Sequence, residues 1–358
     1  MKSTREAAAL LAPGPDARRP QVRLPHLVPL VAVPWASLTL VLVGWLLAPA
    51  LLEKVIYLPL LVSTVLFGIP HGALDHLVPG RQGRPWADRP WRVALYVGGY
   101  ALLAALTLGL WFVAPVATFW GFLLMSLLHW GQGDLHTLET VQGRRRSGPW
   151  SAPLTLLARG SLPILLPLLV FPDWYARLAT GIDQAFGLPV PSGPILPGPL
   201  PALLGAGLAV VLLAYAADTL VSSRRPRLEL AETGLLLLVF SVVPAPLSIG
   251  AYFPLWHAWR HLGRLLALPD GRSSAGSPGP QRRMMRLALD LLPITLVALV
   301  MLAGLYFWAA PRVHDAQTFA ALYLALIAAL TLPHALLVAL MDLPLRRSDP
   351  RPSGASPE

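Results

Sequence analysis

The chain has 358 residues, of which 55% are hydrophobic and 13% are charged. This composition is too apolar for a soluble globular domain and is typical of a polytopic membrane protein. There is no cysteine, so disulfides, iron–sulfur clusters and thiolate metal sites are excluded. The net charge of +10 comes from short basic clusters between apolar runs, as in membrane-protein loops, so we expect no nucleic-acid partner.

The two ends of the chain are more polar than its middle. The apolar stretch near the N-terminus is too short for the core of a signal peptide. We therefore predict disordered cytoplasmic tails at residues 1–25 and 343–358, and one transmembrane domain at residues 26–342.

Apolar runs long enough to cross a bilayer, about 20 residues each, recur along the whole middle of the chain. In order they cover residues 27–50, 55–79, 92–114, 117–138, 150–171, 200–222, 228–246, 249–268, 285–310 and 317–341. With the N-terminus inside, the outside loops hold only Lys54, Arg177 and Arg312, and all inside loops are basic. By the positive-inside rule, the sequence predicts an all-α bundle of ten transmembrane helices in the inner cell membrane, with both termini cytoplasmic.

Histidines are concentrated on the even-numbered spans, which run from outside to inside. These residues are His71, His76, His129, His136, His257, His261 and His334. Each lies within a few turns of the cytoplasmic end of its span, so parallel helices would bring imidazoles to one layer. Imidazoles without thiolates fit non-haem Fe(2+), although the ligand type also allows zinc and copper. We favour a metal site over histidines that only bond to neighbouring helices.

The spacing of the histidines identifies one pair clearly. His257 and His261 are four residues apart, on one face of a helix, so both can bind one ion. His129 and His136 share a face but are two turns apart, and one ion is not expected to take both. Spacing leaves open which of those two is the ligand.

The second span has a less regular pattern. His71 and His76 are five residues apart and diverge on a regular helix, but Gly68, Pro70 and Gly72 predict a local break. Periodicity cannot choose between these two histidines.

Two carboxylates follow the histidines at short spacing. Asp75 and Asp134 would be costly in lipid, and they can either accept the outer N–H of a ligating imidazole or pair with Arg159, Arg260 or Arg264. Both interpretations stay open.

Aromatic residues accompany the histidines. Trp130 and Trp256 are candidates for the lining of an apolar pocket, although membrane aromatics more often pack or form interfacial belts.

Four sequence blocks carry a family resemblance: GIPHGALDHLV, LLHWGQGD, YFPLWHAWRHLGRLL and LPHALLVALMD. Together, in this order from the second span to the tenth, they resemble the Brp/Blh family of membrane carotenoid oxygenases. Members of that family cleave β-carotene at its central double bond to give retinal.

The resemblance implies a non-haem Fe(2+) site whose ligands are His71, His129, His257 and His261. Around these ligands or in the pocket we place His76, Asp75, Asp134, His136, His334, Arg159, Trp130 and Trp256. The implied partners are β-carotene and O2 as substrates, the lipid bilayer, and a rhodopsin that would receive the retinal.

Three other classes of protein compete with this one. A di-iron desaturase or hydroxylase needs more histidine boxes than the single HxxxH present. A metal-ion transporter is disfavoured because few acidic residues mark a path through both leaflets. A retinal-binding opsin is excluded, because the only lysines are Lys2 and Lys54, and neither lies inside a span.

Overall fold

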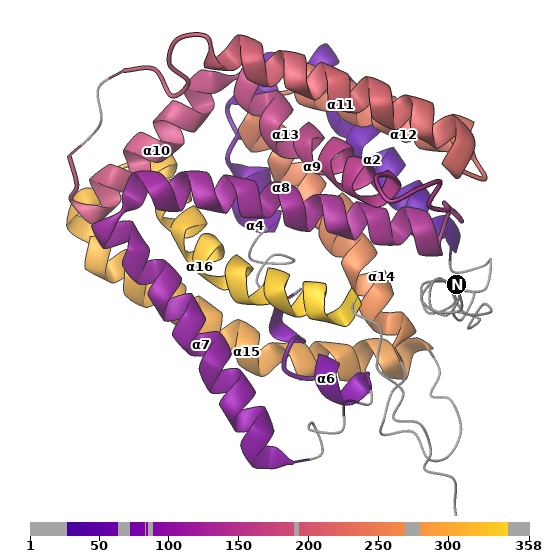
Figure 1. Cartoon of the computed structure of the whole chain (residues 1–358). Coiled ribbons are helices and arrows are strands. Elements are labelled where there is room, and N and C mark those ends of the chain that lie inside the picture. The colour runs from indigo at the N-terminus through magenta and orange to yellow at the C-terminus, as the bar shows by residue number, and fades with distance from the viewer. Residues whose placement is uncertain are drawn as a thin grey trace, which may run out of the picture.

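The structure of the chain is a computed structural model. It describes residues 27–63, 72–82, 84, 89–189, 193–268 and 280–342. Every regular element within these ranges is a helix, and the helices gather in one bundle (Figure 1). The all-helical prediction is confirmed. The two predicted tails and His71 lie outside the described residues.

The helices follow the predicted spans closely in the first, third, fifth, sixth, ninth and tenth positions. In chain order the elements are α2 (Leu27–Leu47), α3 (Pro49–Glu53), α4 (Leu58–Ser63), α6 (Val78–Arg81), α7 (Pro90–Val113), α8 (Pro115–Thr140), α9 (Ser151–Val170), α10 (Pro172–Phe186), α11 (Leu200–Ser222), α12 (Pro226–Val242), α13 (Ala245–Tyr252), the π-helix η3 (Phe253–Ala258), α14 (Trp259–Ala267), α15 (Pro280–Ala309), the 3-10 turn η4 (Ala310–Arg312) and α16 (Ala316–Asp342).

Six of the described helices, namely α2, α7, α9, α11, α15 (extended through η4) and α16, are long and apolar enough to cross a membrane. The count of ten spans is therefore not reproduced. The four expected spans that fall short are the second, fourth, seventh and eighth. The second span runs through residues 64–71, which lie outside the described residues, and the other three carry buried polar side chains of the site described below.

The surface of several long helices is what a lipid environment requires. Leu203 and Val221 on α11, and Val300 and Phe307 on α15, are all exposed. Apolar side chains on this scale are stable on the outside of a bundle when lipid, rather than water, surrounds them.

The eighth span is not a regular helix. Pro244 precedes α13 and separates it from α12, as the two prolines of this region suggested. Residues Phe253–Ala258 then form a π-helix that contains Pro254, a residue without an N–H to donate. Such π segments are rare and frequently occur at functional sites, and this one carries His257.

One helix was not predicted. After α9 the chain turns at Phe171 and forms α10, which buries Tyr175, Ile182 and Phe186 and exposes its polar side. It packs against α16 (Figure 1).

α8 and α9 approach each other more closely than side chains would allow. A Cβ on Gly131 would lie 2.0 Å from the carbonyl oxygen of Leu156, and one on Gly160 would lie 1.9 Å from that of Leu127. The two backbones are therefore in direct contact, as at small-residue crossings of membrane helices. This contact fixes the residues of α8 relative to those of α9.

α16 starts at a well-defined cap. The backbone N–H and the hydroxyl of Thr318 both donate to Asp315, at 2.7 and 2.8 Å. These bonds hold the pKa of the Asp315 carboxyl below its usual value, and they satisfy a helix N-terminus that has no partner within its own helix.

Candidate metal centre

Four imidazoles gather in the interior of the bundle: His129 from α8, His257 from η3, His261 from α14 and His334 from α16. The Nε2 atoms of His129 and His257 are 3.2 Å apart. Two nitrogens bound to one metal at about 2.1 Å each lie roughly 3.0–3.4 Å apart at ordinary bond angles. The spacing of this pair therefore suits two ligands of one ion.

The other two imidazoles continue the cluster. The ring of His334 lies 4.9 Å from that of His129 and 5.2 Å from that of His261, measured between centroids. One ligand atom each of Asp75, His261 and His334 lie within 4.8 Å of one another. All of these residues are buried, so a cation bound here would be shielded from bulk water.

Asp75 contacts the Nδ1 side of the His334 ring. Its Oδ2 atom is 2.8 Å from Nδ1 of His334, and the hydroxyl of Tyr100 donates to the same oxygen at 3.0 Å. Asp75 therefore orients an imidazole, and that imidazole belongs to His334.

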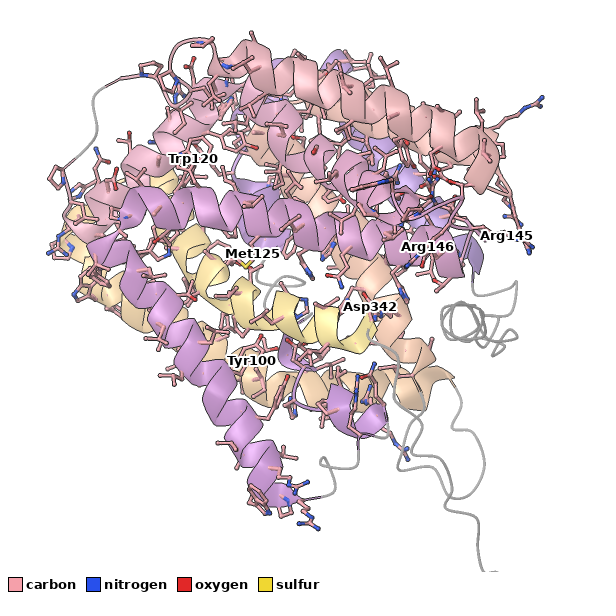
Figure 2. The ribbon with its side chains drawn as sticks, in the orientation of Figure 1. Tyr100, Trp120, Met125, Arg145, Arg146 and Asp342 are labelled. Atoms are coloured by element: carbon pink, nitrogen blue, oxygen red, sulfur yellow. The ribbon has the colours of Figure 1, made fainter. Side chains whose placement is uncertain are left out.

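Two further histidines have other neighbours. Nδ1 of His76 bonds to the carbonyl oxygen of Ala73 in its own turn, at 2.9 Å. Nδ1 of His136 lies 3.6 Å from Asp342, which also accepts hydrogen bonds from Gln132 and Arg264. Asp342 ends α16 and lies near the same end of the bundle as Arg146, which follows α8 (Figure 2).

Asp134 is held by arginines. It accepts bonds from Arg159 at 2.8 Å and from Arg260 at 3.0 Å, and the indole N–H of Trp256 donates to it at 2.9 Å. Arg159 and Arg260 also bind Glu232, at 3.0 and 2.9 Å. Two cations and two anions thus form a closed, neutral ring, which we call the ion ring. Of the two interpretations of Asp134, the structure shows the pairing with arginine, whose charge-assisted bonds are stronger.

A second group of buried charges lies nearby. Arg144 forms close ion pairs with Glu229 and Asp218, and the hydroxyl of Tyr215 donates to Glu229 at 2.7 Å. These residues join the start of α12 to α11 and to the loop after α8.

Sequence reasoning missed Glu229 and Glu232. Both lie at the start of the predicted seventh span, and both are fully buried. The available clue was their spacing: two acids three residues apart lie on one helix face, and arginines inside other predicted spans needed partners.

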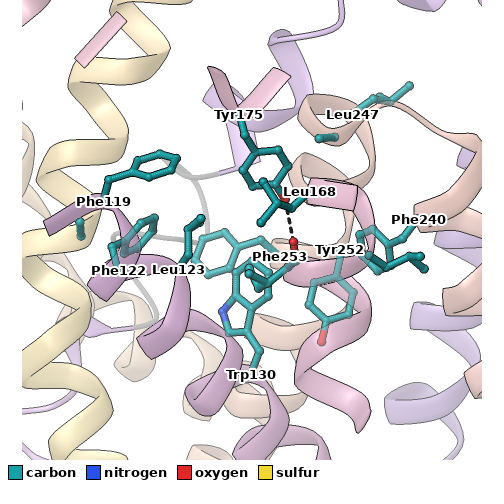
Figure 3. Close-up of a cluster of buried hydrophobic side chains, with 14 of the residues drawn as sticks. Phe119, Phe122, Leu123, Trp130, Leu168, Tyr175, Phe240, Leu247, Tyr252 and Phe253 are labelled. Carbon is teal, nitrogen blue, oxygen red and sulfur yellow. Dashed lines mark hydrogen bonds between the residues drawn. The ribbon is translucent and has the colours of Figure 1, made fainter. Parts of the chain in front are cut away.

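An apolar pocket adjoins the histidine cluster. The space between its lining atoms is about 860 Å³, which includes space open to the outside, and its lining comes from α4, α8, α9, α10, α13, η3 and α16. Trp130 and Phe253 line it, and their rings lie 5.8 and 6.2 Å from the ring of His257. Figure 3 shows Trp130 and Phe253 among the surrounding aromatic side chains. Trp256, by contrast, lies over Arg260, with 4.0 Å between the guanidinium and the ring centroid.

The model of the beta-carotene 15,15'-dioxygenase family matches residues 62–342 of the chain. The chain belongs to this family. The match includes every residue of the histidine cluster and of the ion ring, and it ends at Asp342, the last residue of α16.

Curated relatives in the same family come from an archaeon. The probable beta-carotene 15,15'-dioxygenase Blh of Halobacterium salinarum is 33% identical over 88% of this chain and 92% of its own length. The probable beta-carotene 15,15'-dioxygenase Brp of the same species is 27% identical over 59% of this chain and 58% of its own length. No solved structure gives a significant match to the chain.

Proposed function

We propose that the protein cleaves β-carotene at its central double bond with O2 and releases two molecules of retinal. The observation that carries this proposal is that two aromatic rings of the apolar pocket, Trp130 and Phe253, lie against a buried imidazole of the cluster, in a chain of this family. An apolar polyene and a metal ion would thus meet at Trp130, Phe253 and His257.

We propose Fe(2+) as the metal, held by nitrogens of His129, His257 and His261. His71, which lies outside the described residues, is the fourth expected ligand because of its place in the Pro-His-Gly motif. The donors fit this ion in kind, since imidazoles without thiolates suit non-haem iron. Bound Fe(2+) would supply the activation of O2.

The protein's own residues have three tasks in this reaction. The pocket binds an apolar polyene and excludes water. Trp130 and Phe253 would place one double bond beside the histidines, since both rings line the pocket and both lie against the ring of His257. The ion ring fixes η3 and α14 against α8, and this keeps His257 in place.

The cellular setting belongs to the same proposal. β-Carotene partitions into bilayers, and six apolar helices suit a protein of the cell membrane. We retain ten spans, cytoplasmic termini and delivery of retinal to a rhodopsin as predictions.

The test is expression in a bacterium that accumulates β-carotene. The parent protein should bleach the cells and yield retinal, and His257→Ala should lower the retinal yield by about 100-fold or more because metal and substrate lose their alignment. His314→Ala, at an exposed histidine outside the cluster, is the matched control and should bleach like the parent. If cells that contain the iron-loaded parent protein keep their β-carotene colour, β-carotene is refuted as the substrate.

Metal analysis of the purified parent protein separates this proposal from its closest competitor. We expect one iron per chain. Two irons per chain would favour a di-iron desaturase or hydroxylase.

A further inference from the structure

We propose that His334 is a further metal-binding residue, and that Asp75 and Tyr100 orient it. This inference rests on the proposed function, because it concerns the same metal ion. His334 lies in the block LPHALLVALMD, but the resemblance implies four other ligands, and the sequence places His334 only around them or in the pocket.

The position of His334 places it inside the cluster. Its ring lies 4.9 Å from that of His129 and 5.2 Å from that of His261, and the residue is only 2% exposed. It therefore lies next to two of the expected ligands. Pro333 precedes it inside α16, and a proline there removes a backbone bond and favours a local bend.

The orientation of the ring identifies the nitrogen that can bind a cation. Nδ1 of His334 is 2.8 Å from Oδ2 of Asp75, and a carboxylate can only accept. Nδ1 therefore carries the hydrogen, and Nε2 is the nitrogen whose lone pair can bind a metal. This is the carboxylate–histidine arrangement that fixes the tautomer of metal ligands in many proteins.

Tyr100 completes the support. Its hydroxyl donates to the same oxygen of Asp75 at 3.0 Å, and the side chain of Asp75 is 4% exposed. Three separate parts of the fold, namely α7, the residues before α6 and α16, thus converge on the orientation of one imidazole. A histidine that merely packed between helices would not require this support.

The experiment measures metal binding without β-carotene. The purified full-length chain, freed of metal, is loaded with Co(2+), whose visible absorption reports the number and geometry of its ligands. The Fe(2+) affinity is measured separately by competition with a chelator. We expect His334→Ala and His334→Gln to change the Co(2+) spectrum and to weaken Fe(2+) binding at least tenfold.

The supporting residues give graded effects. Asp75→Asn should weaken Fe(2+) binding by about 10-fold to 100-fold, as for other residues that orient ligands, and Tyr100→Phe should weaken it less. Thr331→Val, one turn earlier on α16, is the matched control. Its hydroxyl bonds only within its own helix, at 2.7 Å, so the spectrum and the affinity should stay those of the parent.

The outcomes are distinguishable. If the parent chain binds neither ion, the proposed metal site itself fails. If the parent binds metal, and a folded His334 variant keeps the parent spectrum and affinity, this inference is overturned while the proposed function stands. His334→Gln preserves much of the side-chain volume, so a folded variant is available if the alanine variant does not fold.

Discussion

At the scale of the residue, Gly133 determines how much room His257 has. A Cβ on Gly133 would lie 3.2 Å from Cε1 and 3.3 Å from Nδ1 of that ring. These separations are tighter than ordinary contacts, so any side chain at this position must push the imidazole away. Gly133 is therefore part of the site although it has no functional group.

Gly133→Ala should separate activity from stability. Alanine in the middle of α8 favours the helix by about 1 kcal/mol, which offsets the cost of displacing the ring, so the unfolding temperature should change little. Retinal yield should nevertheless fall about tenfold or more, because small displacements of reacting groups are costly. Thermal unfolding in detergent and retinal yield are the two measurements.

Gly121→Ala is the matched control for this prediction. Gly121 lies on the same helix, and nothing would come within 4 Å of its Cβ. The control should keep full activity. Equal activity in the two variants would show that His257 tolerates displacement.

The histidines and aspartates of the site could be found from the sequence more readily than the residues that each of them contacts. Histidines and aspartates inside apolar spans stand out, because each is costly in lipid and needs a reason to be there. The proximity of His334 to His129 and His261 could not be read in this way, since no sequence period relates α16 to α8 or α14. The same limit applies to Asp134, whose arginine partners depend on how the helices cross.

At the scale of the element, the contact between α8 and α9 is the least tolerant part of the described fold. The atoms that a Cβ on Gly160 would meet belong to the backbone of Leu127, and a backbone cannot move aside as a flexible side chain can. His129 and Arg159 lie close to this contact on their helices. Any change in the crossing would therefore shift both the cluster and the ion ring.

Gly160→Ala should destabilise the protein strongly. Overpacking usually costs about 1–3 kcal/mol, and the forced backbone shift places this variant at the upper end of that range. Gly207→Ala on α11, where nothing would lie within 4 Å of a Cβ, should unfold at the temperature of the parent or above it. The check is thermal unfolding in detergent, and matching curves for both variants would contradict direct backbone contact.

The elements themselves were largely predictable. The length of the apolar runs locates the six helices that are long enough to cross a membrane. Pro244 marks the boundary before α13. The π-helix was not predictable. The hydropathy of a segment does not distinguish an α-helix, with i→i+4 backbone hydrogen bonds, from a π-helix, with i→i+5 bonds. α10 was missed since its amphipathic pattern falls in a segment too polar for a span.

At the scale of the whole molecule, the ion ring connects four parts of the bundle: α8, α9, α12 and α14. Its members are balanced in charge and are almost fully buried. Removing one partner of a buried pair leaves an uncompensated charge, which is much worse than removing the pair. Stability should therefore depend on neutrality of the ring more than on any one bond.

Glu232→Gln should lower the free energy of unfolding by about 3–5 kcal/mol, because Arg159 and Arg260 would then share Asp134 alone. Adding Arg260→Gln restores neutrality, so the double variant should lose less than the sum of the two single variants. Glu139→Gln is the control. Its partner Arg146 is 59% exposed, and such pairs contribute about 0–1 kcal/mol. Strictly additive losses in the cycle would contradict coupling through the ring.

The order of the ring's charges along the chain bears on how the protein enters its membrane during synthesis. Asp134 and Arg159 are 25 residues apart on the consecutive helices α8 and α9, and Glu232 and Arg260 are 28 residues apart. A lone charge at mid-bilayer costs about 2.5–3.5 kcal/mol on insertion scales, but each of these hairpins carries its own counter-ion. Each hairpin can thus form its own ion pair of the ring before the other hairpin has been synthesised. The cross-links from Arg159 to Glu232 and from Arg260 to Asp134 then form only when the two hairpins dock, so assembly of the bundle and completion of the site become the same late event.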